Sequence, residues 1–220
     1  MRIFVSSLLV CFLNQPLVAE IFSDFPADIQ TDANYAFYSH GLIVEGTDQR
    51  PRHPEFGVYQ FPEIVQALHA QGNFNLIAQH RPARTVPEVH AQQLIGWVNR
   101  LLDAGVLAEN ITLIGFSRGA QITLLASDEL RESGINTVVM AVCFDGDYPS
   151  DPPLKLGGHV LSLFETSDVV NSCSTLLQRS TDAISVQEIA ITTGLRHGAF
   201  YTPHNAWLTP LRAWLSNLYP

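Results

Sequence analysis

Ile111-Thr112-Leu113-Ile114-Gly115-Phe116-Ser117-Arg118-Gly119 is the stretch that decides the fold. Its six mostly apolar residues predict a buried strand, and apolar residues recur at helical spacing after Gly119. A serine at the tip of a tight strand-to-helix turn needs a strained backbone, and side chains at Gly115 or Gly119 would collide with the crossing strand and helix. The stretch therefore predicts a sharp turn that presents Ser117, and bulk at either glycine should damage it.

Strand-like and helix-like runs alternate from about residue 33 onward. Strands are expected at 35–39, 75–80, 111–116, 137–144, 160–165 and 186–192. Helices are expected between and after them, with Pro62 in a first turn, Gly105 closing a second helix, Gly134 ending the one after Ser117, and Thr209-Pro210 opening the last. Such alternation predicts a mostly parallel sheet between two helical layers, a three-layer α/β/α sandwich with ligand sites at the carboxyl ends of its strands.

Composition favours one domain over residues 20–220. A chain of 220 residues is long enough for a single sizeable core, and its 15% of charged residues fits a sheet covered on both faces. The formal net charge of −9 describes an acidic surface, which repels phosphate backbones and anionic headgroups. Nucleic acid is therefore not an expected partner. The sequence does not fix the oligomeric state, and a monomer is compatible with it.

The first nineteen residues read as a secretory signal peptide that is cleaved after Ala19. Arg2 precedes an apolar run over 3–13, and Leu17, Val18 and Ala19 follow a helix-breaking segment. The run is too short to span a membrane, and a buried N-terminal strand is the alternative reading. The leader predicts a secreted or periplasmic protein.

Cysteine and histidine patterns indicate a disulfide and no metal. Cleavage would remove Cys11 and leave Cys143 and Cys173, an even pair expected to form a disulfide in an oxidising compartment, unless they are two separate buried thiols. None of the eight histidines forms an H-E-x-x-H motif, and the cysteines lack zinc spacing. Neither a phosphate-binding nor a dinucleotide-binding glycine loop is present, so no cofactor is expected.

Ser117 needs a nearby imidazole to take its proton and a carboxylate to orient that imidazole. Asp168 follows the strand expected at 160–165 and is the favoured acid, although a helix cap or turn is its other reading. Asp145 and Glu165 are the rival acids. These positions predict that the carboxylate that orients the imidazole comes from the end of a strand later in the chain than that of the serine.

The favoured base is His197, which follows the last expected strand and lies between Gly194 and Gly198. His204 is the alternative, although it stands beside Pro203 near the expected start of the last helix. Serine, acid and histidine then follow one another in the order of the α/β-hydrolases.

The chain resembles a small, lidless α/β-hydrolase over nearly all of its length from Tyr35. The matching motifs are the Gly115-to-Gly119 turn, Asp168, His197, and His40-Gly41 after the first central strand. The resemblance implies an oxyanion hole formed by the backbone N–H groups of Leu42 and Arg118. Only one glycine follows His40, where the lipase-like branch has a run of them.

The resemblance implies an enzyme that cleaves small or short-chain carboxylic esters through an acyl-enzyme on Ser117. Thioester or peptide-like amide substrates are alternatives, as is a hydrolase-shaped binding protein without catalysis. Dienelactone-type ring opening would prefer a cysteine nucleophile, which the turn lacks. Two loops expected to rim the pocket carry four arginines, Arg50, Arg52, Arg81 and Arg84, the first loop also carrying His53. A further hypothesis is that some of these arginines bind a carboxylate or other anion on the substrate; the alternative is that they are solvated or paired with acidic residues.

Overall fold

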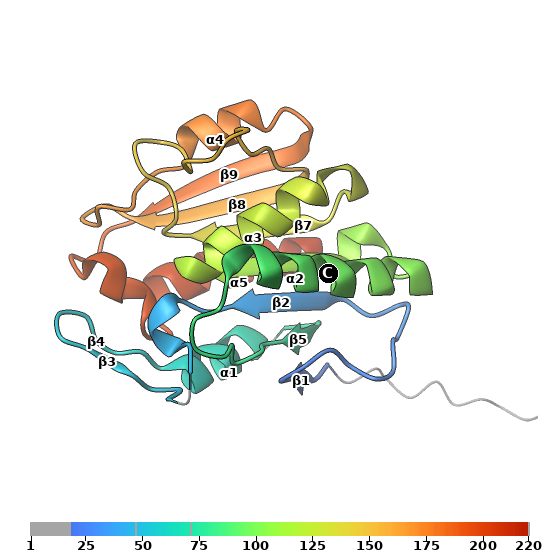
Figure 1. Cartoon of the computed structure of the whole chain (residues 1–220), viewed down its shortest axis with the longest axis horizontal. Coiled ribbons are helices and arrows are strands. Elements are labelled where there is room, and N and C mark those ends of the chain that lie inside the picture. The colour runs from blue at the N-terminus through green and yellow to red at the C-terminus, as the bar shows by residue number, and fades with distance from the viewer. Residues whose placement is uncertain (1–18, 47, 71, 220) are drawn as a thin grey trace, which may run out of the picture.

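A seven-stranded sheet, all of whose pairings are parallel, forms the centre of the molecule. The computed structural model describes residues 19–219 except 47 and 71; the expected leader up to residue 18, with Cys11, lies outside the described residues. The strands run in the order β1-β5-β2-β6-β7-β8-β9 (Figure 1). Their bounds are β1 Ile21–Phe22, β2 Tyr35–Ser39, β5 Asn75–Ile77, β6 Ile111–Phe116, β7 Asn136–Met140, β8 Gly158–Glu165 and β9 Ala183–Ile191.

Helices cover both faces of this sheet, which confirms the expected three-layer sandwich (Figure 1). Side chains of α1 (Phe61–His69) and α5 (Asn205–Leu218) share one core cluster with the strands. On the other face, α2 (Pro87–Ala104), α3 (Arg118–Glu129) and α4 (Ser174–Arg179) cover the sheet. Alternation along β2 divides its side chains between the layers, because successive residues of a strand point to opposite faces.

Shorter elements join these layers. A two-stranded antiparallel hairpin, β3 (Arg52–His53) with β4 (Gly57–Val58), lies in the loop between β2 and α1. Four short 3₁₀ helices complete the described part of the chain: η1 Leu42–Val44, η2 Ala108–Asn110, η3 Arg131–Ser133 and η4 Arg196–Phe200. Among the helices of the described residues, none is both long enough and apolar enough to cross a membrane.

Several element ends differ from the sequence expectation. The predicted start of the last helix at Thr209-Pro210 is wrong: α5 begins at Asn205, because the His204 side chain caps it by accepting from the Ala206 N–H at 3.1 Å. Pro210 therefore lies inside the helix. The strand expected to reach residue 144 ends at Met140, since Ala141 adopts a left-handed φ of 51°. Likewise α3 ends at Glu129 rather than Gly134.

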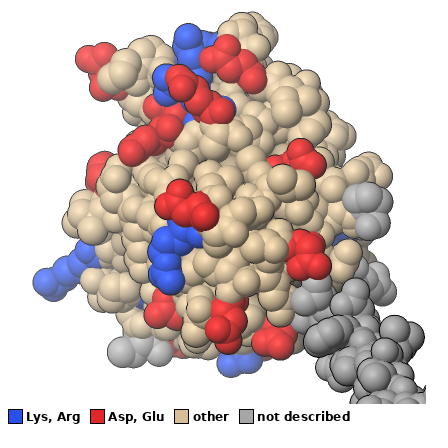
Figure 2. Space-filling model, turned by 90° about the vertical axis from the view of Figure 1, so that its right-hand side faces the viewer, with Lys and Arg blue, Asp and Glu red and all other residues tan. Residues whose placement is uncertain are grey.

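The face away from the carboxyl ends of the strands is mixed in charge. Figure 2 shows acidic side chains scattered among neutral ones, with basic side chains interspersed. No continuous basic surface is visible on this face, as expected for a chain with twelve Lys and Arg against twenty-one Asp and Glu.

The predicted disulfide is present between Cys143 and Cys173. It joins the segment after β7 to the residue before α4, and both cysteines are buried. In the chain-entropy model, a cross-link that closes a loop of this length stabilises the fold by about 3–4 kcal/mol.

We expect the double variant C143S/C173S to lose about that much free energy of unfolding, measured by urea titration, whereas the wild type should lose it only when a reductant is present. Equal stability with and without reductant would contradict this.

Two glycines let α3 pack against the sheet. A Cβ on Gly119 would overlap the Ser39 carbonyl group at the end of β2, and one on Gly115 would lie 2.6 Å from the Cα of Ala120. Both obstacles are backbone, which moves only at high cost. The glycines therefore let the first turn of α3 approach β2 more closely than a residue with a Cβ would allow.

We expect Gly119→Ala to lower the free energy of unfolding by about 1–3 kcal/mol or more and to reduce activity, because α3 must shift away from β2. Gly96→Ala is the matched control, since Gly96 lies exposed in α2 and a Cβ there meets nothing within 4 Å. The control should be neutral or stabilising by about 0.5–1 kcal/mol. Thermal and urea unfolding of both variants measures the difference, and equal effects would refute the packing explanation.

Candidate active site

Three loops at the carboxyl ends of the strands bring Ser117, Asp168 and His197 together. Ser117 follows β6, Asp168 follows β8, and His197 lies in η4 after β9. The Nδ1 atom of His197 is 2.7 Å from Oδ2 of Asp168, and its Nε2 atom is 2.9 Å from Oγ of Ser117. A neutral imidazole that donates from Nδ1 to the carboxylate leaves Nε2 free to accept from the hydroxyl. The serine can thus be relieved of its proton.

Ser117 occupies the strained conformation that the sequence predicts. Its φ is 54° and its ψ is −118°, a left-handed φ that non-glycine residues rarely adopt. The Ser117 N–H donates to the Met140 carbonyl at 2.9 Å, which ties the turn to the end of β7. This turn directs the hydroxyl toward His197.

The alternative acid and base residues make other contacts. Asp145 belongs to a turn after β7 with a φ of 49°, and the carboxylate that contacts His197 is that of Asp168. His204 caps α5, as described above. Glu165 is fully buried but faces the backbone of two loops rather than the imidazole.

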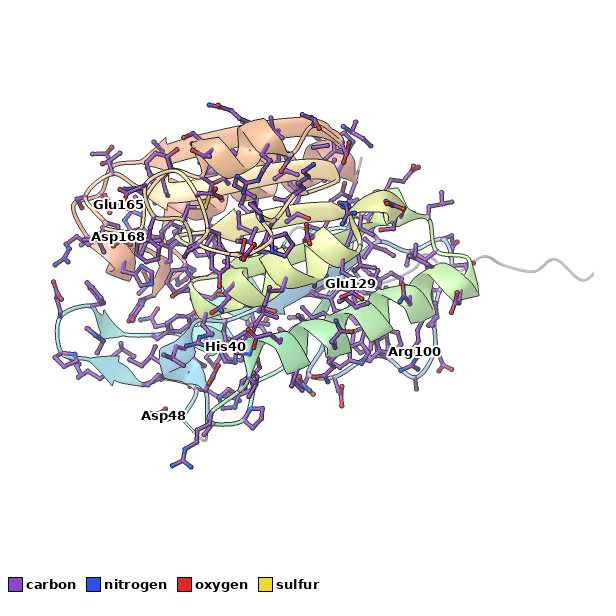
Figure 3. The ribbon with its side chains drawn as sticks, turned by 45° about the horizontal axis from the view of Figure 1, so that its top comes forward. His40, Asp48, Arg100, Glu129, Glu165 and Asp168 are labelled. Atoms are coloured by element: carbon purple, nitrogen blue, oxygen red, sulfur yellow. A yellow bond between two sulfur atoms is a disulfide. The ribbon has the colours of Figure 1, made fainter. Side chains whose placement is uncertain are left out.

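Glu165 clamps the Asp168 loop to the His197 loop. One carboxylate oxygen accepts from the backbone N–H and hydroxyl of Ser167, and the other accepts from the backbone N–H groups of Thr193 and Gly194, at 2.7 and 3.0 Å. Figure 3 shows Glu165 and Asp168 close together at the end of β8. Burial raises the pKa of Glu165, but the hydrogen bonds outweigh it and lower the pKa to about 2. Apart from a carboxylate at a strand end, no pattern in the sequence indicates this clamp.

We expect Glu165→Gln to lower the free energy of unfolding by about 2–3 kcal/mol at pH 7, because an amide group would face backbone donors with its own N–H₂. A lowered pKa means that the carboxylate stabilises the fold fully above about pH 4.5 and loses this effect as the pH falls toward 2. The difference in free energy of unfolding between variant and wild type, measured by urea titration, should therefore become smaller as the pH falls over that range.

The control for this experiment is Glu63→Gln. Glu63 pairs with Arg50 on the surface, where both side chains are well exposed, so we expect a change within about 0.5 kcal/mol. If the loss of free energy of unfolding in Glu165→Gln did not change with pH, the ionised clamp would be excluded as the cause of that loss.

Leu42 and Arg118, the predicted oxyanion-hole residues, line one cavity with Ser117. The first N–H groups of a helix have no partner within it, and Arg118 is the first residue of α3. Leu42 begins η1 directly after His40-Gly41. The other lining residues are Gln121, Ala141, Val142, Phe144, Tyr148 and Val170.

The arginines of the two loops do not line this cavity. The expectation that Arg81 borders the pocket is wrong, because its side chain is completely buried in the core. Arg50 pairs with Glu63, and Arg52 lies in β3. Among the described lining residues the only cation is Arg118. No group of three or more histidine, cysteine or acidic residues among the described residues could hold a metal ion.

Aromatic rings surround the imidazole of His197, a feature that sequence reasoning missed. The ring centroids of Phe116, Phe56 and Tyr201 lie 4.9, 6.1 and 6.5 Å from that of His197. Phe56 comes from the loop of the β3–β4 hairpin, so this loop does reach the site. Only the position of Phe116 beside Ser117 in the sequence could have indicated such a contact.

Comparisons with known proteins agree with this architecture. No family model matches the sequence, and no curated protein matches it. Among solved structures, an arylesterase superposes with a TM-score of 0.62 at 11% identity, over 89% of this chain and 79% of that one. A hormone-sensitive lipase from a metagenome library gives 0.59 at 16% identity, over 86% and 79%.

A third similar structure is a single-residue variant of SOBER1 from Arabidopsis thaliana. Its TM-score is 0.57 at 12% identity, and the match covers 84% of this chain and all of the other. At such identities the likeness concerns the fold alone. The fold of this chain is a parallel sheet with a turn that carries Ser117 after a central strand. The chain therefore has a fold like that of the α/β-hydrolases.

Proposed function

We propose that the protein is a serine hydrolase that cleaves carboxylic esters of small or short-chain acids through an acyl-enzyme on Ser117. The observation that carries the proposal is the unbroken hydrogen-bonded chain from Asp168 through His197 to Ser117. The esterase and lipase names of the similar structures agree with it. No metal or cofactor is needed for this chemistry.

In the proposed reaction, Nε2 of His197 takes the hydroxyl proton as Oγ of Ser117 attacks the ester carbonyl carbon. The negative charge moves to the carbonyl oxygen, where the backbone N–H groups of Leu42 and Arg118 stabilise it. His197 then gives its proton to the departing alkoxide, and the alcohol leaves an acyl-serine. Water, activated by the same imidazole, attacks the acyl group and releases the acid. Asp168 holds the imidazole tautomer and stabilises the imidazolium.

The size of the cavity argues for a small acyl group. Its volume is about 210 Å³, below the roughly 300–1,000 Å³ of sites that enclose drug-sized ligands. Leu42, Val142, Phe144 and Val170 supply apolar walls, while Gln121 and Tyr148 supply polar groups. Such a site accommodates a short acyl chain and leaves a long one in solvent.

We propose in addition that the protein works in an oxidising compartment, secreted or periplasmic after cleavage behind Ala19. The Cys143–Cys173 disulfide and the leader-like sequence of the first nineteen residues support this. The substrate is then an ester met outside the cytosol.

We expect Ser117→Ala to lower kcat on 4-nitrophenyl acetate by ~10⁴-fold or more and Asp168→Asn by ~10³–10⁴-fold. Asp145→Asn is the matched control and should stay within about 2-fold, since Asp168 is the carboxylate that contacts His197. A fluorophosphonate probe should label the wild type and not Ser117→Ala.

In a series of acetate, butyrate and octanoate esters, kcat/KM should fall with the length of the acyl chain.

Other outcomes separate the alternatives. A wild type that neither labels nor turns over ester, thioester or amide substrates would be a binding protein. A clear preference for acyl thioesters over oxygen esters of equal length would make it a thioesterase. Loss of activity in Asp145→Asn but not in Asp168→Asn would reverse the assignment of the acid.

A further inference from the structure

A fully buried arginine lies behind the loop that carries Leu42. The Arg81 side chain has no exposed surface, and its guanidinium Nη2 donates to the carbonyl oxygen of His40. The same nitrogen lies 3.5 Å from Oε1 of Glu45, whose side chain is only 3% exposed. A cation and an anion are thus removed from water directly beneath the segment from His40 to Glu45.

Backbone and imidazole contacts fix the same segment at both ends. The Arg81 N–H donates to Nε2 of His40 at 3.0 Å, and the Arg81 carbonyl accepts from the Gly46 N–H at 3.1 Å. Because Nε2 of His40 accepts, its proton is on Nδ1, which lies 2.8 Å from the Gly41 carbonyl and donates to it. Burial, and then the charge of Arg81, keep the pKa of His40 well below its usual range, so this tautomer persists at neutral pH.

The His40 carbonyl is where the two sides of the predicted oxyanion hole meet. Arg81 contacts it from one side, and the missing Cβ of Gly119 leaves room for it on the other, where such an atom would lie only 2.6 Å away. Gly119 directly follows Arg118, and Leu42 is two residues after His40. The His40–Gly41 peptide group therefore lies between the segment that carries Leu42 and the turn that carries Arg118, and the next peptide group, which bears the Leu42 N–H, is held through its Gly41 carbonyl by Nδ1 of His40.

Stability alone does not account for this arginine. A buried ion pair gains little over apolar residues of similar volume. Here, moreover, Nε and Nη1 of Arg81 have no hydrogen-bond partner among the described residues. The hydrogen bond to His40 is the contact that a lysine or an apolar side chain would not reproduce with the same geometry.

We propose that Arg81 is a positioning residue for the oxyanion hole, which it serves by holding the His40 carbonyl so that the Leu42 N–H faces the oxygen of the tetrahedral intermediate. The inference rests on the proposed function of the site. Since that oxygen carries its charge only in the transition state, a displaced donor lowers kcat and leaves KM nearly unchanged.

Arg81→Lys tests this, because it keeps the charge opposite Glu45 and loses the planar guanidinium. We expect kcat on 4-nitrophenyl acetate to fall about 10–100-fold, KM to change less than about 2-fold, and affinity for an alkyl boronic acid, which forms a tetrahedral adduct on the serine, to weaken in parallel with kcat. Arg212→Lys is the matched control: Arg212 also donates to a backbone carbonyl, that of Ala67, but from α5 and outside the site. It should leave kcat within about 2-fold.

A second variant, R81M/E45Q, removes both buried charges and so leaves no unpaired ion in the core. It should fold, as judged by circular dichroism and a cooperative thermal transition, and show the same loss of kcat. A folded variant with kcat and boronate affinity within about 2-fold of the wild type overturns the proposal. So does failure of both variants to fold, which would make Arg81 a general stabilising residue. A wild type that is inert toward esters and fluorophosphonate would instead refute the proposed function.

Discussion

The close approach of α3 to the end of β2 is the constraint on which the site depends. Only the missing side chain at Gly119 lets the first turn of the helix lie against the carbonyl groups of Ser39 and His40. That contact places Ser117 just past the carboxyl end of β6, where Arg118 and Leu42 line the same cavity. The strained φ of Ser117 follows from it, because the chain must reverse within one residue between strand and helix.

Surroundings give side chains with the same functional group different tasks. Asp168 and Glu165 are three residues apart, yet one faces an imidazole while the other is saturated by the backbone N–H groups of its own and the neighbouring loop. His40 and His197 differ in the same way: His40 is locked between backbone groups beside a buried arginine, whereas His197 bridges a carboxylate and a hydroxyl. The functional group alone would not distinguish the members of either pair.

Local patterns in the sequence predicted most of the fold. The bounds of β2 and β6 and the helix closed by Gly105 agree with the structure, because each leaves a signal within a few residues. The Cys143–Cys173 pair also agrees, although it spans 30 residues, because the expected loss of Cys11 leaves these two cysteines. For the site, sequence reasoning named three residues that the structure brings into hydrogen-bonding distance, and their catalytic roles remain predictions. Long-range contacts explain the misses. The burial of Arg81 depends on partners some forty residues earlier, and the start of α5 on a histidine cap that outweighs the signal of Pro210.

The hydrogen bond between Ser117 and His197 joins positions eighty residues apart, with three parallel strands formed in between. Each parallel neighbour requires a crossover, so such native contacts have high contact order and form late. A partly folded chain that lacks β9 and η4 would carry the hydroxyl and the carboxylate without a proton acceptor. Recovery of the proposed ester turnover would therefore report that β9 and η4 have formed, and not only the segment around Ser117.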